Sequence, residues 1–294
     1  MITSTQNASI RKVSDYLRKK KARDKDTCFV AEGTRLILET PSERIISIYI
    51  SASFSKQTDA DIRRFLQEHQ SHTEIVDDLV FKKFSDTNTP QGIMAVVSQS
   101  KLSVEDVILG RACRTLYTPA AKTASSSATF SSTAAPESPD TPLPLLLILD
   151  GLQDPGNLGT ILRSAEAAGA TGILLCEGTV DIYSPKVVRS TMGSIYRLPF
   201  AHVSDLRATA TLLKKYGIQT VAADMTGDTV YDRFDSTAAV AFIIGNEGNG
   251  LSQTARELTD TFVTIPMAGK TESLNAAVCA SVLLFDAARK RRCR

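Results

Sequence analysis

Three loops in the C-terminal half contain the residue types that could bind a ligand and act on it. They are residues 150–163 (DGLQDPGNLGTILR), 245–252 (GNEGNGLS) and 265–275 (IPMAGKTESLN). The second loop has glycines at 245, 248 and 250, and backbone amides in such a segment can approach a ligand closely. Glu247 lies among them, where a carboxylate is costly unless it is exposed or engaged. Taken alone, this pattern also fits a plain glycine-rich turn.

Capping residues indicate where the helices beside these loops begin. Asn157 can cap a helix that begins at Leu158, and Ser273 or Thr271 can cap the helix that closes the chain. Arg163 falls opposite the apolar stripe of the first of these helices. Spacing alone leaves two interpretations of Arg163, a functional arginine beside the loop and an ordinary exposed one.

The third loop also raises a different chemistry. Gly269-Lys270-Thr271 matches the end of a phosphate-binding P-loop, but that signature needs a glycine five residues before Gly269, and position 264 is threonine. The apolar run that ends in Asp150 could serve as the second nucleotide-binding motif of such proteins, although apolar strands that end in aspartate are common. A P-loop nucleotide hydrolase therefore stays an alternative.

An alternation of apolar runs and helical patterns surrounds the three loops. Strands are predicted at 145–149, 172–175, 198–203, 218–222, 240–244 and 262–265, and helices at 158–168, 184–192, 205–216 and 273–289. Such alternation predicts an α/β domain whose mostly parallel sheet has helices on both faces. Ligands of such sheets bind beyond the carboxyl ends of strands, so we expect the site in the loops after Leu149, Ala222, Ile244 and Ile265.

The first hundred residues predict a smaller α/β domain. Its strands are expected at 28–31, 45–50, 74–76 and 93–97, and its helices at 9–21, 33–39 and 60–69. Residues 118–142 are rich in Ser, Thr, Ala and Pro, and they contain too few large apolar side chains to offset the entropy of ordering them. We therefore predict domains at 1–100 and 144–294, joined by a linker at 101–143.

The basic residues are clustered, although the net charge of the chain is only +2. One cluster comprises Arg11, Lys12, Arg18, Lys19, Lys20, Lys21, Arg23 and Lys25, and a second comprises Arg289, Lys290, Arg291, Arg292 and Arg294. Such clusters fit a polyanionic partner. They fit equally well a solvated helix face and a frayed tail.

Cysteine usage and hydropathy exclude other classes. The five cysteines are scattered without a C-x-x-C pair, which argues against a disulfide framework and a zinc site. The first residues are polar, and the longest apolar runs, 143–149 and 238–244, are far too short for a membrane span. We therefore expect a cytoplasmic protein without a membrane or metal partner.

Taken together, the three loops resemble the sequence motifs of the SpoU/TrmH branch of the SPOUT methyltransferase superfamily. These motifs are N-L-G-x-x-x-R, G-N-E-x-x-G-L-S and I-P-M-x-G-x-x-x-S-L-N, in this order and each after a predicted strand. The N-terminal half is similar to the substrate-binding domain often attached to these enzymes, which has a ribosomal-protein-L30e-like fold. That similarity rests on 29–33 (FVAEG), 84–87 (FSDT) and 90–92 (PQG).

The resemblance implies a C-terminal trefoil knot, although chains otherwise do not thread loops. It also implies that the loops of the knot bind S-adenosylmethionine and that two catalytic domains form a homodimer. The residues that match the expected cofactor site are Ala223, Gly245, Asn246, Gly250, Ile265, Pro266, Met267 and Leu274. Those that match the polar catalytic set are Asn157, Arg163, Glu247, Ser273 and Asn275.

The reaction that the resemblance implies is methylation of a ribose 2′-hydroxyl in RNA. The N-terminal similarity favours ribosomal RNA over transfer RNA. The reaction needs alignment above all and no metal. Ala276 and Ala277 stand where the family often has Val-Ser, and we expect little effect because both residues are small. A non-catalytic RNA-binding protein of the same fold is a further alternative, and the retained polar set argues against it.

Overall fold

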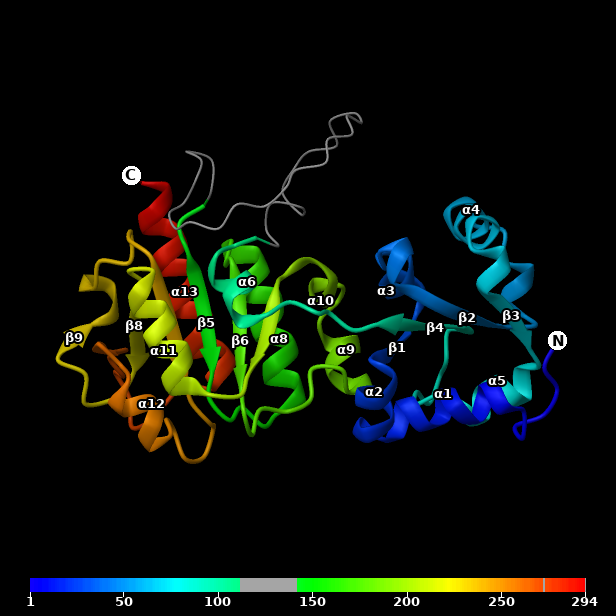
Figure 1. Cartoon of the computed structure of the whole chain (residues 1–294), viewed down its shortest axis with the longest axis horizontal. Helices are drawn as coiled ribbons and strands as arrows, with labels where there is room; N and C mark the ends of the chain where they lie inside the picture. Colours follow the sequence, from blue (N-terminus) through cyan, green and yellow to red (C-terminus); the bar gives the residue numbers. More distant parts are fainter. Residues whose placement is uncertain (112–141, 272, 294) are drawn as a thin grey trace. The chain divides into compact units, whose positions relative to one another are not determined.

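The computed structural model describes residues 1–111, 142–271 and 273–293 (Figure 1). Most of the predicted linker at 101–143, together with Cys113, therefore lies outside the described residues. The chain divides into two compact units. Unit 1 comprises Met1–Lys101, Gln153–Arg163 and Val180–Tyr196, and unit 2 comprises Leu102–Leu152, Ser164–Thr179 and Arg197–Arg294.

Unit 1 contains a four-stranded sheet within its described residues, in the order β1-β4-β2-β3. β1 pairs antiparallel with β4, β4 antiparallel with β2, and β2 parallel with β3. The strands are β1 (Cys28–Glu32), β2 (Ile45–Ser51), β3 (Thr73–Val76) and β4 (Ile93–Ser98). All four lie where the sequence predicts them, because each is a short apolar run that is buried on at least part of its length.

Helices lie on both sides of this sheet (Figure 1). They are α1 (Ala8–Arg18), α2 (Lys20–Asp26), α3 (Thr34–Leu38), α4 (Ala60–Glu68) and α5 (Asp78–Phe84), with one-turn helices η1 (Ser42–Arg44), η2 (Phe54–Lys56) and η3 (Gln70–His72). Ile10 and Val13 of α1 and Phe81 of α5 form one core with Val30 and Met94 of the sheet. The single helix predicted at 9–21 is instead two helices, because the backbone is extended at Lys19.

Unit 2 contains a seven-stranded sheet within its described residues, in the order β7-β6-β5-β10-β8-β11-β9. Every pairing among these described strands is parallel, which confirms the predicted α/β class and parallel sheet. The strands are β5 (Leu145–Leu149), β6 (Gly172–Cys176), β7 (Phe200–Val203), β8 (Gln219–Ala223), β9 (Thr229–Val230), β10 (Val240–Ile244) and β11 (Thr261–Thr264). β5, β6 and β10 are buried at every residue, as strands covered on both faces must be.

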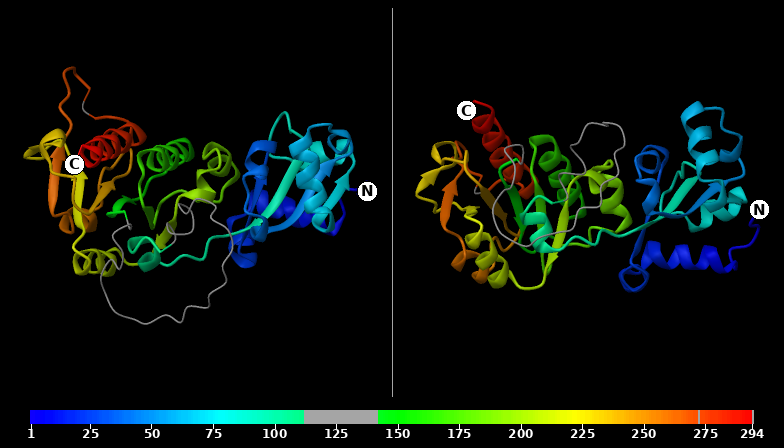
Figure 2. Two further views of the ribbon diagram at one scale, coloured as in Figure 1. Left: turned by 90° about the horizontal axis from the view of Figure 1, so that it is seen from above. Right: turned by 45° about the horizontal axis from the view of Figure 1, so that its top comes forward.

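Helices cover both faces of the parallel sheet. In the view from above, α13 lies on one face and α6 and α11 lie on the other (Figure 2). The helices of this half are α6 (Val104–Ile108), α8 (Pro155–Ala168), α9 (Pro185–Ser190), α10 (Ser194–Arg197), α11 (Leu206–Lys215), α12 (Gln253–Glu257) and α13 (Ala276–Arg292), with η4 (Tyr231–Arg233). By residue, α9, the first part of α8 and all of α10 except Arg197 belong to unit 1.

A helix occupies part of the span predicted as linker. Ser103 and Asp106 form a capping box at the start of α6, in which each side chain accepts a hydrogen bond from the backbone N–H of the other residue. Val107 and Ile108 of α6 are fully buried against β6 and β7. A Cβ on Gly172 of β6 would lie 2.4 Å from Val107, so this packing requires glycine there.

Three side chains of the C-terminal basic cluster form hydrogen bonds or ion pairs within the fold. Arg291 donates hydrogen bonds to the carbonyls of Leu143, Pro144, Ser236 and Ala238. Lys290 contacts the Phe234 carbonyl and Asp286, and Arg289 also pairs with Asp286. These side chains anchor α13 against the segments that lead into β5 and β10. Arg291 and Lys290 therefore neither form a free surface for a polyanion nor belong to a frayed tail, so both interpretations are wrong for these two residues. Arg294 lies outside the described residues.

Two kinds of feature are absent from the described part of the chain. No helix there is both long and apolar enough to cross a membrane. No group of three or more His, Cys, Asp or Glu side chains there is arranged to hold a metal ion. The trefoil knot stays a prediction of the sequence resemblance.

Candidate cofactor cleft and active site

A cleft of about 270 Å³ opens in unit 2 where β8, β10 and β11 end. These strands are neighbours in the sheet, so the segments that follow them meet at one edge. Ile243, Ile244, Leu251 and Cys279 contribute much of its apolar lining. The position agrees with the prediction for the loops after Ala222, Ile244 and Ile265, whereas no residue of the predicted loop after Leu149 lines the cleft.

Seven of the eight predicted cofactor residues line this cleft: Ala223, Gly245, Asn246, Gly250, Ile265, Met267 and Leu274. Pro266 is exposed and does not contribute to the lining. Of the predicted catalytic set, Glu247 and Ser273 line the cleft, whereas Asn157, Arg163 and Asn275 do not.

The glycine-rich loop after β10 folds back on itself. A Cβ on Gly245 would lie 2.5 Å from the carbonyl carbon of Gly250, so only glycine allows this approach. Backbone hydrogen bonds join Asn246 and Gly250 in both directions, at 2.8 and 3.0 Å. Asn246 Oδ1 also accepts from the backbone N–H groups of Gly248 and Asn249. Gly250 has φ +67°, a conformation that glycine adopts without strain. This is an ordered turn that presents its backbone to the cleft.

The loop after β5 is tied to the glycine-rich loop. Asn246 Nδ2 donates to the Gly151 carbonyl at 2.8 Å, and Asp150 Oδ2 accepts from the Ser252 backbone N–H at 2.7 Å. Asp150 is buried. Its carboxylate therefore stabilises the contact between these two loops. Asp150 then no longer supports the interpretation of the preceding strand as the second nucleotide-binding motif of a P-loop protein.

The helix that carries Asn157 and Arg163 starts earlier than predicted. α8 begins at Pro155, and Asp154 Oδ1 accepts from the Asn157 backbone N–H at 2.8 Å. The expected Asn157 cap is therefore wrong, because Asp followed by Pro supplies the stronger start signal, with proline at the first helical position. Arg163 is exposed on α8, as its position opposite the apolar stripe predicts.

The last helix is capped by a residue predicted to be catalytic. Asn275 Oδ1 accepts from the backbone N–H groups of Ala277 and Val278, and α13 begins at Ala276. The expectation that Ser273 or Thr271 caps the helix is therefore wrong. Lys270 and Thr271 are exposed, and no helix follows them directly as it does in a P-loop, so the geometry does not support that alternative.

Asp224 and Arg256 also line the cleft, and neither was predicted from the sequence. Arg256 Nη2 donates to Asp224 Oδ2 at 2.6 Å, and Asp224 Oδ1 accepts from the hydroxyl and backbone N–H of Thr226. Burial acts to raise the pKa of Asp224, but these hydrogen bonds outweigh it and hold the pKa below its usual value. Arg256 is the only cation among the described residues of the lining. The one signal in the sequence was the place of Asp224 directly after a strand.

The cleft offers no reactive thiol among its described residues. Cys279 contributes to the lining, and burial raises the pKa of its thiol to about 11. The thiol is therefore neutral at pH 7 and unsuited to act as a nucleophile. What remains is an apolar wall, exposed backbone and a few polar side chains, a set that suits binding and alignment of an amphipathic ligand.

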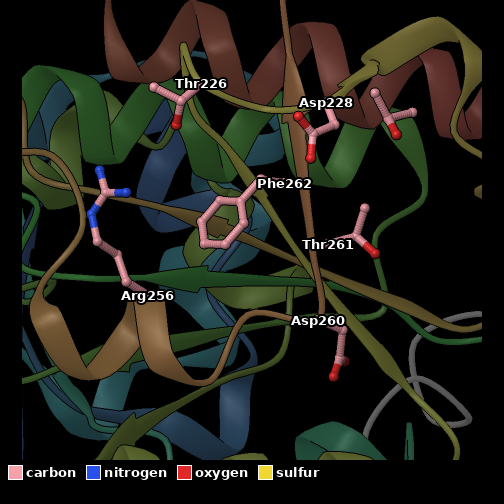
Figure 3. Close-up of a pocket in the computed structure, with 7 residues that line it drawn as sticks. Thr226, Asp228, Arg256, Asp260, Thr261 and Phe262 are labelled. Carbon is pink, nitrogen blue, oxygen red and sulfur yellow. The ribbon is translucent and has the colours of Figure 1, made fainter.

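A second, more polar pocket shares Arg256 with the cleft (Figure 3). Thr226 and Asp228 reach it from the segment after β8, and Asp260, Thr261 and Phe262 reach it from the start of β11. Asp260 is engaged elsewhere, because its carboxylate accepts from the backbone N–H and hydroxyl of Thr220. None of the predicted site residues lies in this pocket.

Two family models match the chain. Residues 144–285 match the SpoU rRNA Methylase family, and residues 7–95 match the MRM3-like substrate binding domain. An uncharacterized tRNA/rRNA methyltransferase of a Mycobacterium species is 43% identical over 148 residues. That alignment covers 50% of this chain and 47% of the relative, so the chain spans about half the length of the curated relatives it matches.

Solved structures resemble nearly the whole chain. The SpoU methyltransferase AviRb from Streptomyces viridochromogenes, in complex with the cofactor AdoMet, has a TM-score of 0.78 and 26% identity, covering 98% of this chain and 100% of that one. An RNA 2′-O ribose methyltransferase has a TM-score of 0.72 and 28% identity, with 99% of both chains covered. This chain therefore combines an MRM3-like substrate binding domain with a SpoU methylase domain, and the SpoU methylases are a family that depends on S-adenosylmethionine.

Proposed function

We propose that this chain transfers a methyl group from S-adenosylmethionine to a ribose 2′-hydroxyl of RNA, with ribosomal RNA as the substrate. One observation carries the proposal: residues of the second and third motifs, which are separate in the sequence, line a single cleft at the ends of β8, β10 and β11. The family description and the solved RNA 2′-O ribose methyltransferase of similar structure support the same activity.

The cleft suits the chemical make-up of S-adenosylmethionine. Apolar side chains such as Ile265, Met267 and Leu274 fit the adenine ring, and the close approach of Gly245 to Gly250 keeps backbone groups within reach of polar atoms. Asp224 and Arg256 add opposite charges at the lining, and the amino-acid part of the cofactor carries both charges too. Bound there, the cofactor would supply an electrophilic methyl group on a sulfonium sulfur.

The polar set would align the RNA and support loss of the 2′-hydroxyl proton. We assign Arg163 to an RNA phosphate and to the negative charge that grows on the 2′-oxygen. Asn157 would help to orient the ribose, and Ser273 and Asn275 would fix the approach of the substrate beside the cleft. Glu247, exposed at the cleft, is one route for the departing proton, and water or the RNA phosphate is another. Methyl transfer would then form a bond from this oxygen to the methyl carbon as the carbon–sulfur bond breaks.

We include a homodimer formed through the C-terminal domain in this proposal. Val278 and Phe285 are exposed apolar residues of α13, two turns apart and so on one side of the helix. A second copy of the chain would remove this apolar surface from water. We also propose the cytoplasm as its compartment, because that is where its RNA substrate and cofactor meet.

Calorimetry on the full-length chain tests the cofactor assignment. S-adenosylmethionine should bind and should raise the melting temperature by mass action, whereas ATP should not bind. Binding should survive Lys270→Ala, since Lys270 does not line the cleft. A folded protein that binds ATP but not S-adenosylmethionine would favour the nucleotide hydrolase instead. A protein that binds RNA and neither small molecule would favour the non-catalytic alternative.

A further inference from the structure

Residues Val180–Tyr196, which follow the fifth and sixth strands of the chain, belong to unit 1. α9, in the middle of this segment, packs against β1 of the N-terminal sheet. Arg189 of α9 donates to Asp86 at 2.9 Å, next to the two hydroxyls of Ser85 and Thr87 that bind Glu32. We call Val180–Tyr196 the docking segment.

A buried ion pair fixes the beginning of the docking segment. Arg23 Nη2 contacts Asp181 Oδ2, and only 5% and 14% of the two side chains are exposed. Arg23 Nη1 also donates to the Tyr16 carbonyl, which ties the pair to α1. Arg23 belonged to the basic cluster predicted for a polyanion, but at this depth it cannot contact a phosphate. Its positive charge instead pairs with Asp181 inside unit 1.

Two tyrosines fix the rest of the segment. The ring of Tyr183 stacks on Phe29 of β1 at 4.9 Å between centroids, and its hydroxyl accepts from the Ser100 backbone N–H at 2.8 Å. Tyr196 lies 6.3 Å from Phe29, and its hydroxyl accepts from Thr40 Oγ1 at 3.0 Å. The segment is therefore held along its whole length and not at one point.

The docking segment also contacts α8, the helix that carries Asn157 and Arg163. A Cβ on Gly159 would lie 1.8 Å from Ser190 Oγ and 3.0 Å from the Ser190 backbone, so α8 approaches α9 as closely as glycine allows. Ser190 Oγ also reaches the Pro155 carbonyl. Arg163 lies one turn beyond Gly159 on the same side of α8, so this contact determines where its Cα lies.

We propose that Arg23, Asp181 and Tyr183 are positioning residues, which dock Val180–Tyr196 on the N-terminal sheet and so set where α8 holds Asn157 and Arg163. The inference rests on the proposed function, because it concerns the placement of the groups that act on RNA. The substrate-binding domain then has a second role besides binding RNA. It supports the first part of α8 through the docking segment, within the same compact unit.

Asp181→Ala tests this role, because it removes the acceptor of the Arg23 ion pair and touches no residue assigned to RNA or cofactor. We expect kcat at saturating RNA and S-adenosylmethionine to fall by about tenfold to a hundredfold, as small misplacements of a reacting group do. The cofactor Kd should stay within twofold of wild type. The double variant Arg23→Met/Asp181→Leu replaces the pair by apolar side chains and should recover most of the rate.

Hydrogen exchange supplies a readout that needs neither RNA nor methylation. In Asp181→Ala, amides of residues 156–163 should exchange faster, whereas those of Leu145–Leu149 should not change. Arg64→Ala is the matched control, since it breaks an exposed ion pair with Asp61 in the same unit and should leave kcat and exchange unaltered. If wild type fails to methylate RNA, the proposed function fails, and the exchange result still tests the docking.

Two outcomes would overturn the inference. One is a wild-type kcat in Asp181→Ala, and the other is a lower kcat with unchanged exchange at 156–163. Should Asp181→Ala fail to fold, Tyr183→Phe removes only the hydroxyl that contacts Ser100 and keeps the stacked ring. That variant should lose activity several-fold with an unchanged cofactor Kd, and full activity in it would count against the proposal.

Discussion

Arg163 is the residue on which the proposed chemistry depends most. It is exposed on α8, where it can reach a large polyanionic substrate. An arginine guanidinium stays protonated in proteins, so it cannot accept the 2′-hydroxyl proton as a general base. It can place a positive charge beside the developing alkoxide and grip a phosphate with its planar fork.

Arg163→Ala should therefore nearly abolish turnover and leave cofactor affinity almost unchanged. Placed charges of this kind contribute roughly 3–4 kcal/mol to lowering a barrier, a few hundred-fold in rate. Arg163→Lys keeps the charge, loses the fork and should retain part of the rate. Single-turnover methylation and calorimetry measure the two quantities separately. Methylation by Arg163→Ala at close to the wild-type rate would refute this role.

Asp224 leads to a prediction about pH. Its folded-state pKa lies below the usual value of 3.8, so the pair with Arg256 contributes stability above pH 3.8 and loses it as the pH falls through the folded pKa. The difference in melting temperature between wild type and Asp224→Asn should be constant from pH 5 to 8 and should shrink below pH 4. A difference that instead grows as the solution is acidified would contradict the assigned ion pair.

At the residue scale, the family motifs predicted more residues of the cleft than the spacing of residue types alone could. Glycines 245 and 250 were predictable because a tight turn after a buried strand needs them. The pair of Asp224 and Arg256 was not predictable, because the two residues are 32 positions apart and only the fold of the sheet brings them together. Asn275 was not predicted as the cap of α13, because it was already interpreted as a catalytic residue. Both roles would use the same side-chain amide.

At the scale of elements, the glycine-rich loop gives the sharpest test. Gly245→Ala places a Cβ 2.5 Å from the backbone of Gly250, so the loop must shift. Overpacking of this kind typically costs about 1–3 kcal/mol. We expect a lower free energy of unfolding and at least tenfold weaker binding of S-adenosylmethionine. Thermal melts and calorimetry measure both.

Gly269→Ala is the matched control for this loop. Gly269 belongs to the third motif, but a Cβ there would meet nothing within 4 Å, and its φ is not positive. Stability and cofactor binding should therefore stay near wild type. If Gly245→Ala and Gly269→Ala behaved alike, the close approach after β10 would not be what shapes the cleft.

Element types were predictable wherever a run is continuous and fully buried. β5 and β10 have the predicted bounds, because five successive apolar residues between turn formers leave little choice. α5 and β9 were missed. α5 is only two turns long, and β9 is two half-exposed residues that pair only because β11 lies beside them. Such elements depend on tertiary neighbours that local sequence does not encode.

At the scale of the whole molecule, the basic residues of α1 and α2 are the candidate RNA surface. Lys19, Lys20 and Lys21 are exposed, whereas Arg23 is buried and excluded from it. Replacing the three lysines by alanine should weaken RNA binding and lower the slope of log K against log salt by roughly 2. Lys214→Ala/Lys215→Ala on α11 is the control. An unaltered slope would mean that the three lysines form a solvated helix face and do not contact RNA.

The central claim is that the methyl group goes to a ribose oxygen of RNA, and alkaline hydrolysis tests it most directly. Ribosomal and transfer RNA would be incubated separately with the full-length chain and labelled S-adenosylmethionine. A methylated 2′-oxygen cannot attack the adjacent phosphate, so the label should survive alkali in a dinucleotide. We expect this product from ribosomal RNA. Label released in a mononucleotide would mean base methylation, and it would contradict the account.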